Sequence, residues 1–197
     1  MLAAFVGCVL LVTAAAIAWN NGIGEQIFPK RWVDLAPGFY RSAQLHPRLI
    51  KRVLEERQVR VIVDLTDPDL SRATQRAEQE ASAELGISHH RFPLSGDGLG
   101  DIQHYADAIE VIADARQNEV PVLVHCSAGS RRVAGVVATY QLLVEGEDPE
   151  AAYAELDRYG RTPVAETPLV AFLNQNMGTL ADELVSRGVL DRAPRPL

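Results

Sequence analysis

Residues 120–137, VPVLVHCSAGSRRVAGVV, constrain the fold more than any other stretch of this chain. The apolar, β-branched run at 120–124 is typical of a strand buried on both faces, whereas 131–144 has helical spacing and no proline. A strand is therefore expected to pass into a helix through the loop 126–131. Because this loop has small residues around Gly129, its N–H groups can form an anion cradle at the positive end of the helix.

Two reactive side chains flank this loop. The helix dipole and the cradle donors both favour the thiolate form of Cys126, which makes it a candidate nucleophile. Arg132 begins the helix and can fold its planar guanidinium back to bind two oxygens of a phosphate. The cradle itself would be formed by Ser127, Ala128, Gly129, Ser130 and Arg131. A buried structural cysteine in an ordinary strand-loop-helix crossover is the alternative interpretation.

Four residues of this stretch resemble the HCxxGxxR signature of the cysteine-dependent protein tyrosine and dual-specificity phosphatases. They are His125, Cys126, Gly129 and Arg132. Residues 37–44, PGFYRSAQ, are similar to the YRS-x-Q segment of an atypical bacterial and fungal branch of that superfamily. The resemblance implies a tyrosine-phosphatase-like fold, a cysteinyl-phosphate intermediate and no metal or other cofactor. It also implies supporting roles for His125 and Arg41, although a surface salt bridge is an equally good interpretation of Arg41.

The mechanism of that superfamily uses a mobile aspartate as general acid on a loop before the signature cysteine. Asp97 stands 29 residues before Cys126, between Gly96 and Gly98, which leave its loop free to close. Asp101 is the rival candidate. It directly precedes a helical pattern, where an aspartate typically caps the helix, so Asp97 is the preferred acid.

Two features depart from the superfamily pattern. Val133 follows the signature arginine, where most members have a Ser or Thr whose hydroxyl stabilises the departing sulfur, so breakdown of the phosphoenzyme is expected to be slow. Ser127 and Ser130 replace the lysines of members that resemble inositide phosphatases, which disfavours a polyphosphorylated inositol substrate.

Three functions are compatible with these residues. The first is a dual-specificity or tyrosine phosphatase-like hydrolase that acts on a phosphorylated protein or a small phosphomonoester. The second is a rhodanese-like sulfurtransferase, which also loads a cysteine in a strand-loop-helix cradle but needs no loop acid such as Asp97. The third is a phosphate-binding pseudophosphatase, which Val133 makes credible.

Alternating strands and helices are expected along the rest of the chain. The strands are at 59–65, 87–94 and 120–125, and the helices are at 47–57, 71–85, 102–116, 131–144, 148–159 and 167–187. This order requires crossovers, and it predicts an α/β fold with a mainly parallel sheet flanked by helices. The highly charged helix at 71–85 is expected on the outside.

No metal site is expected from the acidic and histidine residues. Asp64 and Asp67 follow a strand, where turn formation and helix capping are the preferred roles. His89 and His90 are not at a convincing metal-binding distance in sequence from any cysteine or acid.

The N-terminal stretch differs from the rest of the chain. Residues 2–19 carry no charge and are almost wholly apolar, and as a helix they would span roughly 27 Å, close to the bilayer core. Segment 1–19 is expected to be a transmembrane anchor. Lys30 and Arg31 follow it and no basic side chain precedes it, so the catalytic domain is expected in the cytoplasm. A signal peptide removed during export is the alternative.

The remaining domain boundaries follow from this apolar segment, and the partners are limited by the net charge of the chain. A linker is expected at 20–31, a single catalytic domain at 32–190 and a tail at 191–197. The net charge of −7 without a basic stripe argues against nucleic acid as a partner. The chain has two cysteines, and since Cys8 lies in the apolar segment, no disulfide framework is implied.

Overall fold

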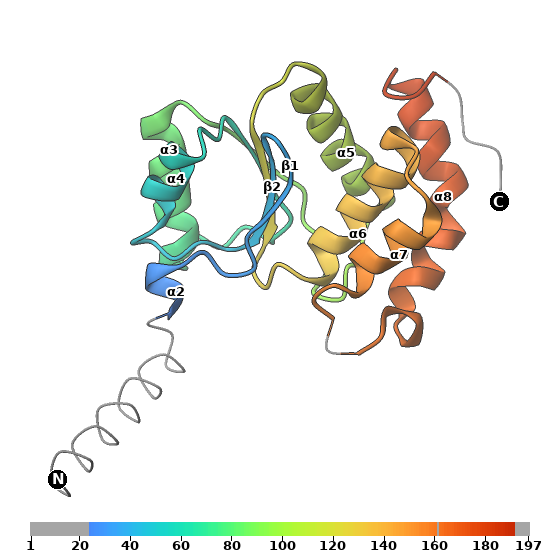
Figure 1. Cartoon of the computed structure of the whole chain (residues 1–197), viewed down its shortest axis with the longest axis horizontal. Coiled ribbons are helices and arrows are strands. Elements are labelled where there is room, and N and C mark those ends of the chain that lie inside the picture. Colours follow the sequence, from blue (N-terminus) through green and yellow to red (C-terminus); the bar gives the residue numbers. More distant parts are fainter. Residues whose placement is uncertain (1–23, 161, 192–197) are drawn as a thin grey trace, which may run out of the picture.

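The computed structural model describes residues 24–160 and 162–191. Its centre is a sheet with the strand order β1-β2-β5-β3-β4, and helices lie on both sides of it (Figure 1). The strands are β1 Val33–Ala36, β2 Phe39–Ala43, β3 Val61–Asp64, β4 Ser88–Arg91 and β5 Val122–Cys126. β1 and β2 are antiparallel, and the other neighbours are parallel. The predicted α/β fold with a mainly parallel sheet is confirmed, whereas the apolar segment at 1–19 lies outside the described residues.

β1 and β2 are absent from the sequence-based prediction. β1 has only four residues and no clear alternation of buried and exposed positions. β2 carries Arg41 at its centre, and a hydrophobic pattern places such a residue outside the core although it is completely buried here. The sequence signals that find strands therefore fail at this hairpin for two different physical reasons.

Seven α-helices fall within the described residues. They are α2 Gly24–Ile27, α3 Ile50–Glu56, α4 Ala73–Leu85, α5 Ile102–Gln117, α6 Arg131–Tyr140, α7 Pro149–Asp157 and α8 Pro168–Ser186. A π-helical turn, Gln141–Glu145, continues α6, and a 3-10 turn, Val164–Glu166, precedes α8. α3 and α4 cover one face of the sheet, while the other face packs against the group of helices that contains α5, α6, α7 and α8 (Figure 1). α2 lies inside the predicted linker.

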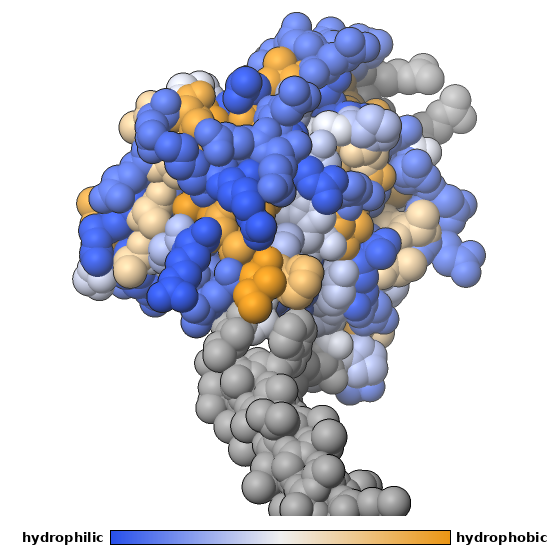
Figure 2. Space-filling view, turned by 60° about the vertical axis from the view of Figure 1, so that its left-hand side comes forward, coloured by the Kyte–Doolittle hydropathy of each residue, from blue (hydrophilic) through white to orange (hydrophobic). Residues whose placement is uncertain are grey.

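The outer surface in the view of Figure 2 is largely hydrophilic, with a few apolar patches.

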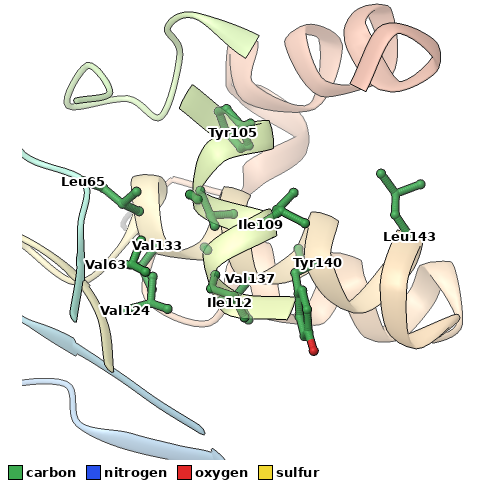
Figure 3. Close-up of a cluster of buried hydrophobic side chains, with 14 of the residues drawn as sticks. Val63, Leu65, Tyr105, Ile109, Ile112, Val124, Val133, Val137, Tyr140 and Leu143 are labelled. Carbon is green, nitrogen blue, oxygen red and sulfur yellow. The ribbon is translucent and has the colours of Figure 1, made fainter. Parts of the chain in front are cut away.

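The larger hydrophobic cluster lies between the sheet and α5 and α6 (Figure 3). Its members include Val63, Val124, Ile109, Val133 and Val137. Each such side chain contributes about 1.5–3 kcal/mol when fully buried. This packing fixes the start of α6 against the end of β5.

Alternation along β5 decides where its last two side chains point. Val122, Val124 and Cys126 belong to the cluster on the α6 side, and Leu123 belongs to the cluster on the α3 and α4 side. Because successive residues of a strand point to opposite faces, His125 leaves the sheet on the side of α4, opposite to Cys126.

A row of polar side chains crosses the α4 side of the sheet. Register places Ser42 of β2 beside His125, His125 beside Asp64 of β3, and Asp64 beside Arg91 of β4. Arg91 is bound to the Asp64 carboxylate at 2.8 and 2.9 Å. Three of the four residues are buried, so this row has to be satisfied within the protein.

Glu78 of α4 covers the row. Its Oε1 lies 3.1 Å from Nε2 of His125 and 3.0 Å from Nε2 of His89, and its Oε2 accepts a bond from Gln44. His89 follows Glu78 by 11 residues and lies on another element, so spacing in the sequence does not mark this contact. This helix lies on the outside of the sheet as expected, but one of its faces is buried, and hydrophobic periodicity does not detect that face because it is mostly polar. That face consists of Gln75, Glu78, Ala81 and Ser82.

Charge on the pair of His125 and Glu78 is stabilised by mutual attraction. Burial alone would lower the pKa of His125, but the carboxylates of Glu78 and Asp64 outweigh it and raise this pKa to about 9. Burial alone would raise the pKa of Glu78, but the two histidines lower it to about 2. The contribution of His125 to stability is therefore complete below pH 6.5 and is lost as the pH rises through about 9. That of Glu78 is complete above 4.5 and is lost as pH falls through about 2.

Glu78→Gln is expected to lower the free energy of unfolding by roughly 3 kcal/mol at pH 6, because it leaves a buried imidazolium without its carboxylate. The difference from wild type should shrink at pH 9.5, where His125 has lost its proton in both proteins and the lost ion pair no longer counts. Urea unfolding at both pH values measures this. Glu80→Gln, on an exposed position of the same helix, is the control and should leave the unfolding free energy unchanged. An equal loss for Glu78→Gln at both pH values would show that Glu78 acts through packing alone.

Candidate active site

The loop predicted to hold the chemistry lies at the carboxyl end of β5, between β2 and β3. Cys126 is buried, and its Sγ accepts a hydrogen bond from the N–H of Gly129 at 3.2 Å. α6 begins at Arg131, so the positive end of its dipole adjoins the loop. Both the donor and the dipole stabilise negative charge on the sulfur.

Gly129 is required by the close approach of this loop to β2. Its φ is +63°, and a Cβ atom at this position would lie 2.4 Å from the N of Ala43 and 2.7 Å from the carbonyl carbon of Ser42. No other residue fits this space without moving the backbone. The end of β2 therefore fixes the middle of the loop.

Arg132 lies at the same edge of the sheet as Cys126. Its NH1 donates to the carbonyl oxygens of Leu65 and Leu94 at 3.3 and 3.4 Å, which lie just beyond β3 and β4. The neighbouring Arg131 is directed elsewhere, since its NH2 donates to the carbonyl of Thr162. Of these two arginines, Arg132 is the one held at the carboxyl ends of the parallel strands.

Arg41 is completely buried, which excludes the surface salt bridge as its role. Its NH2 donates to the carbonyl oxygen of Gly129 at 2.9 Å, it forms an ion pair with Glu155 of α7, and it lies over the ring of Tyr159 at 5.2 Å. Burial lowers the pKa of Arg41 to about 10, so the side chain is charged at neutral pH. It binds the loop from the side of α7.

Asp97 is exposed on the loop between β4 and α5. Its carboxylate accepts hydrogen bonds from the hydroxyl of Ser95 and, at 3.2 Å, from the N–H of Leu99. The bond from Ser95 lowers the pKa of Asp97. These bonds hold the carboxylate of Asp97 in a turn of its own loop.

The loop of Asp97 borders the start of α6. A Cβ atom on Gly98 would lie 3.2 Å from the carbonyl oxygen of Arg131, and the hydroxyl of Tyr105 donates to the carbonyl of Gly98 at 2.7 Å. Asp101, the rival acid, accepts a bond from the N–H of Gln103 at 2.9 Å and caps α5. Its predicted capping role is confirmed.

Four side chains of the described residues have ligand atoms within 4.8 Å of one another and could in principle hold a metal ion. They are Asp64, Glu78, His89 and His125. Each is already engaged: Asp64 binds Arg91 and the N–H and hydroxyl of Thr66, and Glu78 lies against both imidazoles. A metal would have to displace these contacts, so the donor set fits a network of ion pairs and hydrogen bonds better. Asp64 thus forms a turn as predicted, but the N-cap of α4 is Arg72.

Three contributors to the site are missing from the sequence analysis: Arg31, Glu155 and Tyr159. Arg31 contacts Ala128 across 97 residues of sequence, and no local pattern marks such a pair. Glu155 carried one signal, because it lies on the buried side of α7 with Ala152 and Leu156. An acid on an otherwise apolar helix face indicates a buried partner.

Known proteins resemble this chain in sequence. The family described as "Polymorphic toxin system, DSP-PTPase phosphatase" matches residues 40–147, which run from β2 through the loop to α6 and its π-helical turn. The dual specificity protein phosphatase TpbA of Pseudomonas aeruginosa strain UCBPP-PA14 is 29% identical over 145 residues, which are 73% of this chain and 59% of that protein. The chain therefore spans less than two thirds of the length of the curated relatives it matches.

Solved structures share the fold. That of P. aeruginosa TpbA has a TM-score of 0.56 and 22% identity, covering 72% of this chain and 81% of its own. The core catalytic domain of the PP-IP phosphatase SIW14 from S. cerevisiae, in complex with citrate, has a TM-score of 0.64 and 14% identity, covering 83% and 96%. Because the family match extends over more than half of its residues, the chain belongs to the DSP-PTPase phosphatases of polymorphic toxin systems, a bacterial-type family of the cysteine-dependent dual-specificity and tyrosine phosphatases.

Proposed function

We propose that this protein hydrolyses phosphomonoesters through a cysteinyl-phosphate intermediate. The observation that carries the proposal is the N–H of Gly129, which points at Sγ of Cys126 from a loop that leads into α6. In the first step the thiolate attacks phosphorus in line, so that an S–P bond forms as the P–O bond to the leaving group breaks. In the second step water attacks phosphorus, the S–P bond breaks and inorganic phosphate leaves.

The other residues are assigned to charge and proton transfer. Arg132 and the N–H groups of residues 127–131 hold the equatorial oxygens of the phosphoryl group. Asp97 protonates the departing alkoxide and then takes a proton from the attacking water. Arg41 supports the loop through the carbonyl of Gly129. The imidazolium of His125 adds a positive charge next to Cys126 in the chain.

The proposed substrates are phosphorylated proteins or small phosphomonoesters. A structure of a P. aeruginosa TpbA variant in complex with pTyr, with a TM-score of 0.51 and 24% identity, supports a phosphotyrosyl group. PTPMT1 in complex with PI(5)P has a TM-score of 0.54 and 18% identity. Ser127 and Ser130 add no charge for several phosphates in this chain, so a single aryl or alkyl monoester is preferred.

A phosphate-binding pseudophosphatase is the second candidate, and one observation favours it. Val133 has no hydroxyl to assist the departing sulfur. Its side chain is completely buried near Val63 and Val124 (Figure 3). The phosphoenzyme would then form and persist. A rhodanese-like sulfurtransferase is a third possibility, but it leaves the loop of Asp97 without a role.

Cys126→Ser is expected to lower the rate of p-nitrophenyl phosphate hydrolysis more than about 10³-fold under reducing conditions, since it removes the nucleophile. Cys8→Ser, which changes the other cysteine, is the control and should keep the wild-type rate. A wild-type rate in Cys126→Ser would refute the hydrolase. A burst of one p-nitrophenolate per protein without turnover would favour the pseudophosphatase, and thiocyanate formation from thiosulfate and cyanide would favour the sulfurtransferase.

Asp97→Asn is expected to lower kcat for alkyl phosphates about 10²-fold, and to affect p-nitrophenyl phosphate less because its leaving group needs little protonation. Wild-type activity should fall as pH rises and the acid ionises, whereas the variant should show no such fall. Profiles of kcat against pH for both substrates test this. Asp101→Asn is the matched control, and because asparagine also caps helices it should keep both the cap of α5 and the wild-type profile. A flat profile in Asp101→Asn alone would move the acid to Asp101.

We further propose that residues 2–19 anchor the protein in a membrane, with the catalytic domain in the cytoplasm. Support comes from the sequence and from Ile27 and Phe28, which are 47% and 59% exposed near that segment in the chain. None of the helices that the structure describes has the length and hydrophobicity of a bilayer-spanning helix.

Tags at both termini test this topology in intact cells treated with protease. An anchor of the proposed orientation exposes the N-terminal tag to digestion and protects the C-terminal tag. A shortened, exported protein that lacks the N-terminal tag would show that the segment is a cleaved signal peptide.

A further inference from the structure

Two successive carbonyl groups of the catalytic loop are each bound by an arginine. NH1 of Arg31 donates to the carbonyl oxygen of Ala128 at 2.7 Å, and NH2 of Arg41 donates to that of Gly129 at 2.9 Å. A trans peptide unit is planar, and its C=O and N–H point in opposite directions. Holding the carbonyl of Ala128 therefore sets the direction of the N–H of Gly129, the group that points at Cys126.

We propose that Arg31 is a positioning residue for the catalytic loop, which holds the peptide between Ala128 and Gly129 so that its N–H points into the site. The inference rests on the proposed function, because it assigns a task to that loop. Arg31 precedes the first strand of the sheet, and its guanidinium binds the carbonyl oxygen of Ala128, so the role assigned to it acts through this peptide.

Arg31 is itself held in place from several directions. Its guanidinium lies over the ring of Tyr159, 5.5 Å from the centroid, and the carbonyl of Lys30 accepts a bond from the N–H of Ala43 at 3.0 Å. Its φ is +53°, a left-handed conformation that non-glycine residues adopt at a cost and keep where surrounding contacts fix them. Gly129 packs against Ala43. The bond from Ala43 to Lys30 and the bond from Arg31 to Ala128 therefore lie on either side of the same part of the loop.

Tyr159 joins the two arginines that bind the loop. The guanidinium groups of Arg31 and Arg41 both lie over its ring, at 5.5 and 5.2 Å. The ring comes from the turn after α7, whose Glu155 pairs with Arg41. The loop is therefore supported by three segments that are far apart in sequence: the stretch before β1, β2 and the end of α7.

Arg31→Gln in the full-length protein is expected to lower kcat/KM for p-nitrophenyl phosphate about tenfold, as the loss of one charge-assisted hydrogen bond predicts. The affinity of the loop for tungstate, an inert oxyanion, should fall by a similar factor in calorimetric titrations. Arg31→Lys keeps the charge but loses the planar fork and the stacking on Tyr159, so it should restore only part of both quantities.

Arg57→Gln is the matched control. Arg57 is exposed and lies over the rings of Trp32 and Tyr40, as Arg31 lies over Tyr159, but it binds Asp34 instead of the loop. It should leave both quantities unchanged. Wild-type values in Arg31→Gln would overturn the proposal. An equal loss in Arg57→Gln, or full restoration by Arg31→Lys, would also overturn it, because charge alone would then explain the effect.

Tungstate binding separates this inference from the proposed function. If the wild type binds tungstate but shows no hydrolysis that depends on Cys126, the hydrolase fails and the comparison of tungstate affinities still decides the role of Arg31. If the wild type does not bind tungstate, the anion cradle does not exist and both proposals fail.

Discussion

The contact between Gly129 and the end of β2 is the constraint on which the rest of the site depends. A side chain there would collide with the backbone of Ser42 and Ala43, so the loop can approach β2 only at a glycine. That approach brings Arg41 within reach of the Gly129 carbonyl. β2 belongs to a hairpin with β1, which adds an antiparallel edge to an otherwise parallel sheet.

The two faces of β5 have different environments. Cys126 belongs to the hydrophobic cluster with α6, whereas His125 enters a buried polar network with Glu78. Buried ion pairs such as Arg41 with Glu155 are costly to desolvate and add little net stability, but a missing partner is severely destabilising. We therefore regard these pairs as fixing geometry: each locks one residue that touches the loop or adjoins Cys126.

The sequence predicts the local parts of this arrangement well. Alternating strands and helices, the loop between β5 and α6, and the capping role of Asp101 follow from periodicity and short motifs. It misses buried charges whose partners are remote in sequence. Because Arg41 is charged, β2 is not recognised as a strand, and because Glu78 is charged, α4 appears fully exposed. The contact of His89 with Glu78 of α4 is not predicted either. Hydrophobic patterns assign charged residues to the surface, and only three-dimensional pairing shows otherwise. The catalytic roles themselves, including that of Asp97, are predictions that depend on chemistry and not on the fold.

The contact of Arg31 with Ala128 separates two meanings of a domain boundary. Judged by the sheet, the domain begins at Val33, and the expected start at residue 32 keeps every strand and both hydrophobic clusters. Judged by the loop, the domain begins earlier, because the guanidinium that binds the carbonyl of Ala128 belongs to Arg31. A fragment cut at residue 32 would keep the sheet and both clusters and still lack this contact, so under the proposed role of Arg31 the fold and the geometry of the loop have different boundaries.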